Sequence, residues 1–157
     1  LVLEAGHALV RRSSPDDPAG PSRGEDAPPV YLLDSIGELS AVYREARLAF
    51  VGGSLVPTGG HNPIEAWAAG VPVIVGPHTA NFRDIVRDGL AIGILEVVRD
   101  GAGLSRALAA ALADPAGLAR RAEAARRAVA EGRGAVARTA DLVLPLLPPA
   151  AGRAASR

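Results

Sequence analysis

The sequence contains neither cysteine nor methionine in its 157 residues. Without cysteine, the chain can form no disulfide, no thiolate metal cluster and no thiol nucleophile, which fits a reducing compartment. Because methionine is absent even from the first position, we expect a fragment of a longer protein, with a length that suits one domain.

Long apolar runs and an excess of either charge are also lacking. No run approaches the roughly 18 residues that would suggest a membrane span, and no signal peptide is visible. The 17 basic and 17 acidic side chains cancel, so the charge gives no reason to bind nucleic acid or an anionic membrane. Four arginines interrupted by Glu123 predict a solvated helix face: Arg120, Arg121, Arg126 and Arg127. We therefore expect a soluble chain without a nucleic-acid partner.

The stretch from Phe50 to Asp84 alternates short apolar runs with glycine-rich turns. The apolar run Leu48–Val51 ends at a Gly-Gly pair, and a second turn follows at Gly59–Asn62. Short apolar runs bounded by glycine are typical of buried strands, so the predicted order is strand, glycine loop, short helix, strand and loop.

The short helix is predicted over Pro63–Ala69, with Asn62 as its N-cap and Pro63 as its first residue. Gly70 ends this helix, and Val71–Val75 follows as a buried strand. Proteins with parallel sheets bind ligands beyond the carboxyl ends of the strands, where helix N-termini offer free N–H donors. The start of this helix is therefore the candidate anion site.

Glu65 lies three residues after the predicted N-cap, and two interpretations of it remain open. In a capping box, its carboxylate would accept a hydrogen bond from the backbone N–H of Asn62. In a nucleotide site, it would accept hydrogen bonds from a ribose diol.

Two blocks of sequence resemble one family of enzymes. The run GGSLVPTGGHNPIEAWAAGVPVIVGPHTANF closely resembles the donor-binding segment of the bacterial Kdo transferases. These enzymes move 3-deoxy-D-manno-octulosonic acid (Kdo) from CMP-Kdo to a lipid A precursor. The match is nearly continuous over about thirty positions, which makes chance a poor explanation. Upstream, Asp34–Leu39 is similar to the Asp-Thr-x-Gly-Glu-Leu block of the family, in the same order and at the same spacing.

The resemblance implies an α/β fold: the Rossmann-like, carboxyl-terminal half of a two-domain (GT-B) glycosyltransferase, with a parallel sheet and helices on both faces. Residues 1–147 would form the CMP-Kdo-binding domain, truncated at its amino end, with a mobile loop at 13–29 and a disordered tail at 148–157. Independently of the resemblance, the apolar run Ala91–Val98, interrupted by Gly93, predicts a further strand.

The implied function is inverting transfer of Kdo to the lipid A precursor lipid IVA, without metal or cofactor. The catalytic carboxylate, the acceptor site and the membrane-associating segment would lie in an amino-terminal domain outside this chain. The fragment would therefore not catalyse transfer alone. The full-length protein would work at the cytoplasmic face of the inner membrane.

Carried over position by position, the resemblance places CMP between two groups of residues. They are Ile36, Gly37 and Glu38 on one side, and Asn62, Pro63, Ile64 and Glu65 on the other. Backbone N–H groups at the two helix starts would bind the phosphate, and Glu65 would bind the ribose. Ser35 and the Ala66-Trp67 pair depart from the family, which more often has Thr and Pro-Ala there.

Other elements follow from periodicity and turn residues. Helices are predicted at Leu1–Arg12, Ile36–Glu45, Asn81–Val86, Leu104–Ala113, Leu118–Glu131 and Ala135–Leu147. Strands are predicted at Val30–Leu33 and Ala46–Val51, and a turn is predicted at Asp88-Gly89. The segment Ser13–Pro29 is predicted to be a loop because it is rich in proline.

Three polar residues of the central stretch could suggest other chemistry. His61 and His78 lie in loops, but no third ligand stands at a suitable spacing, so a metal site is not expected. His61 is expected instead to shape the glycine turn or to touch the donor. Ser54 lacks the Gly-x-Ser-x-Gly elbow of a nucleophile and is interpreted as a hydrogen-bonding loop residue.

Two alternative functions remain. One is a two-domain glycosyltransferase that uses a UDP-sugar, since the Glu-Ala-x-Ala-x-Gly-x-Pro-Val pattern recurs in such enzymes; the Gly-Gly-His-Asn-Pro run argues against it. The other is a non-catalytic nucleotide-binding module.

Overall fold

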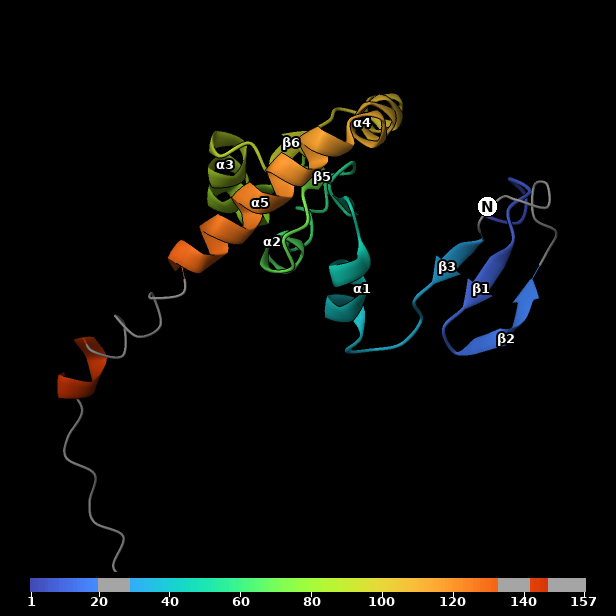
Figure 1. Ribbon diagram of the computed structural model, residues 1–157, viewed down its shortest axis with the longest axis horizontal. Helices are drawn as coiled ribbons and strands as arrows, with labels where there is room; N and C mark the ends of the chain where they lie inside the picture. The colour runs from blue at the N-terminus through green and yellow to red at the C-terminus, as the bar shows by residue number, and fades with distance from the viewer. Residues whose placement is uncertain (20–28, 133–141, 147–157) are drawn as a thin grey trace, which may run out of the picture.

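The computed structural model describes residues 1–19, 29–132 and 142–146, and their strands form two sheets (Figure 1). The strands of the first sheet are β1 (Leu9–Arg11), β2 (Ser14–Ala19) and β3 (Val30–Leu32). β1 is central, antiparallel to β2 and parallel to β3. In Figure 1 this sheet stands apart from the helices and is joined to them through α1.

The second sheet is parallel throughout. Its strands are β4 (Ala49–Val51), β5 (Val73–Val75) and β6 (Leu95–Val97). β5 is central, with Val73 opposite both Ala49 and Leu95. All three residues of β5 are buried, as expected for a central strand that is covered on both faces.

Helices cover both faces of this second sheet. The helices of the chain are α1 (Leu39–Glu45), α2 (Ile64–Ala68), α3 (Arg83–Ala91), α4 (Gly101–Ala113) and α5 (Pro115–Gly132). Two 3₁₀ turns are also described, η1 (Ala80–Phe82) and η2 (Leu144–Leu146). On one face, Ala66 of α2 and Val86 of α3 pack against Val73 and Val75. On the other face, Ile74 packs against Ala107 of α4. α5 runs across the body and contacts α2 and α4 (Figure 1).

The predicted fold class is therefore confirmed, although the predicted single sheet is not. In the described residues β3 and β4 are not paired, and β1 and β2 form an antiparallel pair. The helix predicted at Leu1–Arg12 is wrong: the first residues form turns that end at Gly6, which has a φ of +79°, and Leu9–Arg11 pairs as a strand. Alternation of apolar residues over so short a segment did not distinguish helix from strand.

The loop predicted at Ser13–Pro29 is wrong for its first part, which forms the strand β2. β2 is an edge strand, where proline is tolerated because its outer side needs no ladder hydrogen bond. Residues 20–28, residues 133–141 of the last predicted helix, and the predicted tail at 148–157 lie outside the described residues.

Helix α1 begins at Leu39, three residues later than predicted. The apolar residues Leu39 and Val42 of this helix are each more than 40% exposed. Tyr43, by contrast, packs against the core, where α1 meets α2.

The turn predicted at Asp88-Gly89 is wrong, because both residues lie inside α3. Gly89 is buried, and a Cβ at this position would overlap the ring of Trp67. Glycine thus serves here to let α3 approach the indole, whose Nε1 is buried without a hydrogen-bond partner in the described part of the chain.

We predict that Gly89→Ala destabilises the fold by about 1–3 kcal/mol, because the new methyl group must displace the indole. Alanine's better helix propensity, worth about 1 kcal/mol, should not offset this overlap. Urea unfolding would measure the change. Gly101→Ala is the control, since a Cβ there meets open space at the start of α4. Equal stabilities of the two variants would contradict the prediction.

Candidate functional site

The candidate site is built on the loops that follow β4 and β5, which lie at the same edge of the parallel sheet because neighbouring strands run the same way. Ser54 joins these loops. Its hydroxyl donates to the carbonyl oxygen of Val51 at 2.6 Å and accepts from the N–H of Gly76 at 2.8 Å. Ser54 is fully buried, and the prediction that it is a hydrogen-bonding loop residue is confirmed.

Backbone hydrogen bonds hold the same loops together. The N–H of His78 donates to the carbonyl oxygen of Ser54 at 3.0 Å, and the N–H of Asn81 donates to that of Gly59 at 3.3 Å. Gly59 has a φ of +91°, and a Cβ there would lie 2.5 Å from the amide nitrogen of Asn81. The glycine turn is therefore fixed against the loop after β5.

His61 packs over the first glycine turn. Its ring Cδ2 lies 3.0 Å from the position of a Cβ on Gly53, which has a φ of +69°. This contact agrees with the prediction that His61 shapes the turn.

The N-cap of α2 is Pro63 rather than the predicted Asn62, but the side-chain oxygen of Asn62 still accepts a hydrogen bond at the helix start, from the N–H of Ile64 at 3.0 Å. The first regular helical residue is Ile64, one later than expected. Pro63 is buried, whereas Asn62, Ile64 and Glu65 are exposed. The start of α2 thus presents polar and apolar side chains to solvent.

Glu65 points towards α1 rather than back along its own helix. It lines a pocket of about 210 Å³ together with Ser40 and Arg44. Burial, and then the charge of Glu65, raise the pKa of the Tyr43 hydroxyl. No hydrogen bond joins Glu65 to the N–H of Asn62 in the described residues, so the capping box is not formed there.

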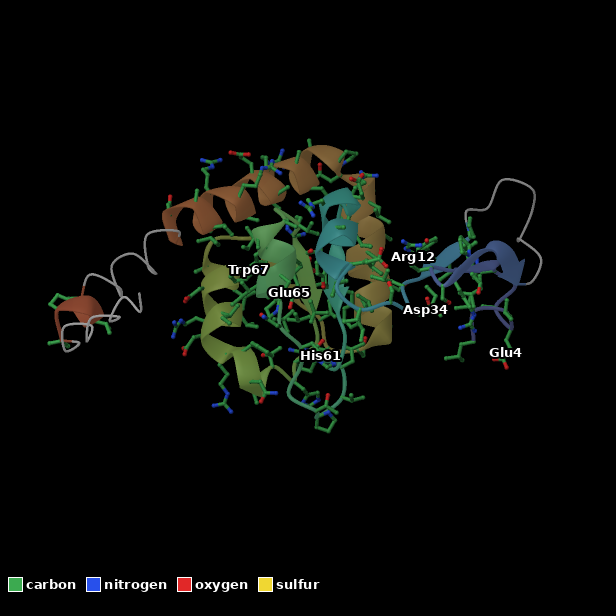
Figure 2. All side chains as sticks on the ribbon, turned by 90° about the horizontal axis from the view of Figure 1, so that it is seen from below. Glu4, Arg12, Asp34, His61, Glu65 and Trp67 are labelled. Atoms are coloured by element: carbon green, nitrogen blue, oxygen red, sulfur yellow. The ribbon has the colours of Figure 1, made fainter. Side chains whose placement is uncertain are left out.

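The second predicted block, at Asp34–Glu38, is bound to the turn between β1 and β2. Asp34 accepts from the N–H of Ser13 at 2.9 Å and from its hydroxyl at 2.7 Å. Glu38 accepts from Nε of Arg12 at 3.1 Å and from the hydroxyl of Ser35. Figure 2 shows Arg12 and Asp34 at the end of the first sheet nearest the helices.

These contacts lower the pKa of both carboxyl groups. The hydroxyl and N–H of Ser13 lower the pKa of Asp34, and the nearby Arg11 adds to the effect. Hydrogen bonds from Ser35 and then Arg12 lower the pKa of Glu38. Both carboxylates therefore stay charged at neutral pH.

The two predicted groups of CMP-binding residues, Ile36–Glu38 and Asn62–Glu65, lie only partly near one another. α1 contacts α2, and Ser40 in the first turn of α1 lies beside Glu65. Ile36 is fully exposed, and among the described residues no hydrogen bond or ion pair joins Ile36–Glu38 to Asn62–Glu65.

Arg12 and Ser13 were not predicted as part of the site. They lie more than 20 positions from their partners in sequence, and the helix predicted over Leu1–Arg12 concealed them. The one available signal was the charged and hydroxyl-rich run at Arg11–Ser14, which no local pattern connects to Asp34.

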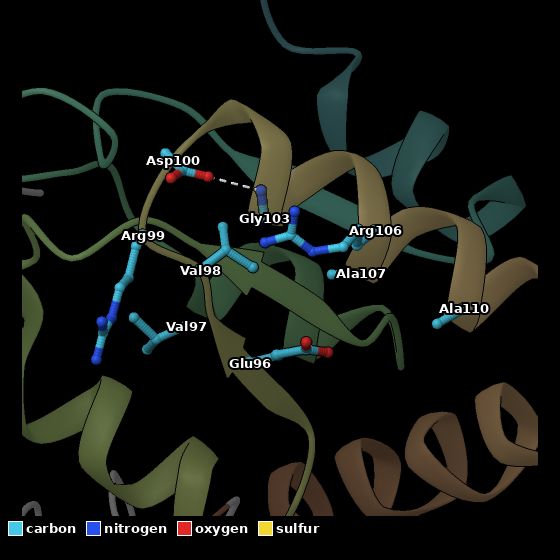
Figure 3. Close-up of a pocket in the computed structure, with 9 residues that line it drawn as sticks. All are labelled: Glu96, Val97, Val98, Arg99, Asp100, Gly103, Arg106, Ala107 and Ala110. Atoms are coloured by element: carbon cyan, nitrogen blue, oxygen red, sulfur yellow. Dashed lines mark hydrogen bonds between the residues drawn. The ribbon is translucent and has the colours of Figure 1, made fainter.

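A larger pocket, of about 610 Å³, lies beside β6 and the first turns of α4 (Figure 3). Two of its acidic groups already have partners: Asp100 caps α4 by accepting from the N–H of Gly103 at 2.7 Å, and Glu96 lies 3.8 Å from Arg121. None of the predicted site residues lines it. A pocket of about 450 Å³ lies instead at the loops after β4 and β5, with Gly59 and His78 in its wall.

Within the described ranges, no three His, Asp or Glu side chains are grouped as metal ligands would be. In the same ranges, no helix combines the length and the hydropathy needed to cross a membrane.

Residues 30–128 match the family model for glycosyl transferases group 1, and the chain belongs to this family. The match includes both predicted blocks, the whole parallel sheet and most of its helices.

Two relatives are named 3-deoxy-D-manno-octulosonic acid transferase. The one from Bordetella pertussis is 43% identical over 137 residues, which cover 87% of this chain and 31% of the relative. The one from Haemophilus influenzae is 41% identical over 148 residues, which cover 94% of this chain and 33% of the relative. The chain thus spans about a third of the length of these curated relatives.

One solved structure is similar in both fold and sequence. It is the crystal structure of the C-terminal CMP-Kdo binding domain of WaaA from Acinetobacter baumannii, with a TM-score of 0.68 and 32% identity. The likeness covers 82% of this chain and 64% of that one. The predicted resemblance to the Kdo transferases is confirmed.

We predict that Ser35→Ala raises the pKa of Glu38, because it removes the largest single cause that lowers it, and that Arg12→Gln also raises it, because it removes both a hydrogen bond and a nearby positive charge. A carboxylate with a lowered pKa stabilises the fold at neutral pH. That stabilisation is lost as the pH falls below about 4.3 towards the folded-state pKa. NMR titration of the Glu38 carboxyl carbon would measure the shifts, with Ser105→Ala on α4 as control. Identical titrations in all three variants would refute the assigned cause.

Proposed function

We propose that this chain supplies the CMP-Kdo-binding half of a transferase that moves Kdo from CMP-Kdo to the lipid A precursor lipid IVA. The observation that carries the proposal is the near-continuous motif run on the loops after β4 and β5. The likeness to a solved domain that binds CMP-Kdo supports it. Loops at the carboxyl ends of parallel strands are where such folds bind nucleotides.

In this proposal, CMP lies against both predicted blocks, in contact with Ile36, Gly37, Glu38, Asn62, Pro63, Ile64 and Glu65. Free backbone N–H groups of the two blocks bind the phosphate. The Glu65 carboxylate accepts from the ribose hydroxyls, which is compatible with its exposure and with the absence of a capping bond to Asn62 in the described residues. Ile36 and Ile64, both exposed, provide apolar contact.

The chemical role of this half is to hold the leaving group. As the bond between Kdo and CMP breaks, negative charge grows on the phosphate, and donors already aimed at it stabilise the transition state. The carboxylate that activates the acceptor would lie in an amino-terminal domain, as would the acceptor site. Attack from the face opposite the leaving group inverts the anomeric carbon.

Residues 1–147 would form the donor-binding unit of this transferase. The complete enzyme would work at the cytoplasmic face of the inner membrane, because its acceptor is a lipid. Its amino-terminal domain would make the contact with the membrane. The alternatives are a transferase that uses a UDP-sugar and a non-catalytic nucleotide-binding module. The first alternative predicts a preference for UDP, whereas the proposal predicts a preference for CMP.

We predict that the chain binds CMP more tightly than UMP or UDP, because both blocks follow the pattern of CMP-Kdo enzymes. Calorimetric titration with the three nucleotides would measure the dissociation constants, and a parallel thermal melt would verify that the chain is folded. A preference for UDP would favour a UDP-sugar transferase.

We predict that Glu65→Gln weakens CMP binding by roughly tenfold. The change replaces charge-assisted hydrogen bonds, worth about 1.5–3 kcal/mol, by neutral ones of about 0.5–1.5 kcal/mol. The melting temperature should scarcely move, since Glu65 is exposed and makes no capping bond to Asn62 in the described residues. Glu45→Gln, at the exposed end of α1, is the matched control. An unchanged dissociation constant for CMP would exclude the ribose role.

A further inference from the structure

The pocket of about 450 Å³ at the loops after β4 and β5, called here the rim pocket, lies beside the proposed phosphate site. Its wall includes Gly59, His78, Thr79 and Arg83. Gly59 opens the turn that leads within three residues to Asn62. The volume falls within the range of about 300–1,000 Å³ that is usual for small-molecule pockets.

Hydrogen bonds fix the two loops that form the rim pocket. Gly59 accepts from the N–H of Asn81, and His78 donates its N–H to Ser54. Ser54 is itself anchored to both strands by its buried hydroxyl. The shape of the rim pocket is therefore set before any ligand arrives, which lowers the entropy cost of binding.

Arg83 brings a positive charge to the rim pocket, and among the ion pairs of the described residues none includes it. Arg87, one turn later on α3, provides the contrast. Its guanidinium lies 2.8 Å from Asp84 and 2.9 Å from Asp88, and these contacts raise its pKa. The charge of Arg87 is thus compensated within the helix, whereas that of Arg83 is available to a ligand.

The proposed donor carries two anionic groups close together. Kdo is a 2-keto sugar acid, so its anomeric carbon bears both the carboxylate and the phosphate of CMP. A donor with its phosphate at the turn before α2 therefore carries its carboxylate within a few bonds of that point. A guanidinium matches a carboxylate by two parallel hydrogen bonds, which makes arginine the preferred residue for this recognition.

We propose that the rim pocket holds the sugar of the donor and that Arg83 binds the carboxylate of this sugar. The assignment rests on the proposed function, since it takes CMP-Kdo as the ligand. It adds a specificity-determining residue for the acidic sugar, separate from the residues that hold the nucleotide. His78 and Thr79 supply further polar atoms for the hydroxyl groups of the sugar.

The test compares CMP, which lacks the carboxylate, with CMP-Kdo, which has it. Both ligands are titrated calorimetrically into the wild-type chain, Arg83→Gln and Arg83→Lys. Arg83→Gln should bind CMP within about twofold of the wild type but lose about ten- to a hundredfold in affinity for CMP-Kdo. Arg83→Lys should recover part of that loss, since it keeps the charge but not the paired geometry.

Arg87→Gln is the matched control on the same helix and should bind both ligands as the wild type does. Thermal melts establish that each variant is folded. If Arg83→Gln binds CMP-Kdo normally, or weakens both ligands equally, the assignment of Arg83 is wrong while the nucleotide site stands. If the folded wild type binds neither ligand, the proposed function itself fails.

Discussion

The buried hydroxyl of Ser54 is the contact on which the geometry of the candidate site depends. It connects the end of β4 to the residue that follows β5. It donates a hydrogen bond to the carbonyl oxygen of Val51 and accepts one from the N–H of Gly76, and both of these residues are buried. A buried backbone group without a partner costs about 1–3 kcal/mol, so few other side chains could stand at this point. Gly76 belongs to the same arrangement, because a Cβ there would overlap the backbone of Ser54. The glycine turn, the start of α2 and the wall of the rim pocket all extend from this one fixed point.

The block at Asp34–Glu38 is held differently, by exposed charges rather than by burial. Arg12 and Ser13 hold its two carboxylates, and these contacts join the first sheet to the segment that enters α1. Exposed ion pairs are individually weak and are screened by salt, so this junction can rearrange at small cost. The loops after β4 and β5 thus form a rigid half of the proposed donor site, and the segment before α1 forms an adjustable half.

The sequence predicts the parallel sheet and its site-bearing loops well because their signals are local. Val71–Val75 is a continuous apolar run, Asn62 is a good N-cap, and the glycine turns mark the loops, so each element is specified by its own residues. The errors fall where distant contacts decide. Gly89 predicts a turn until Trp67 is known to pack on it, and Leu9–Arg11 becomes a strand only by pairing with Val30–Leu32. The bonds from Arg12 and Ser13 to the acidic block likewise span more than 20 positions, beyond the reach of any periodic pattern.

Trp67 is the only tryptophan of the chain. It lies on α2, two residues beyond Glu65, and its indole packs against α3 at Gly89. The helix that carries the proposed site therefore also carries the chain's single indole fluorophore, in a partly buried environment. Its emission wavelength and quenching report on this one helix contact without any introduced label.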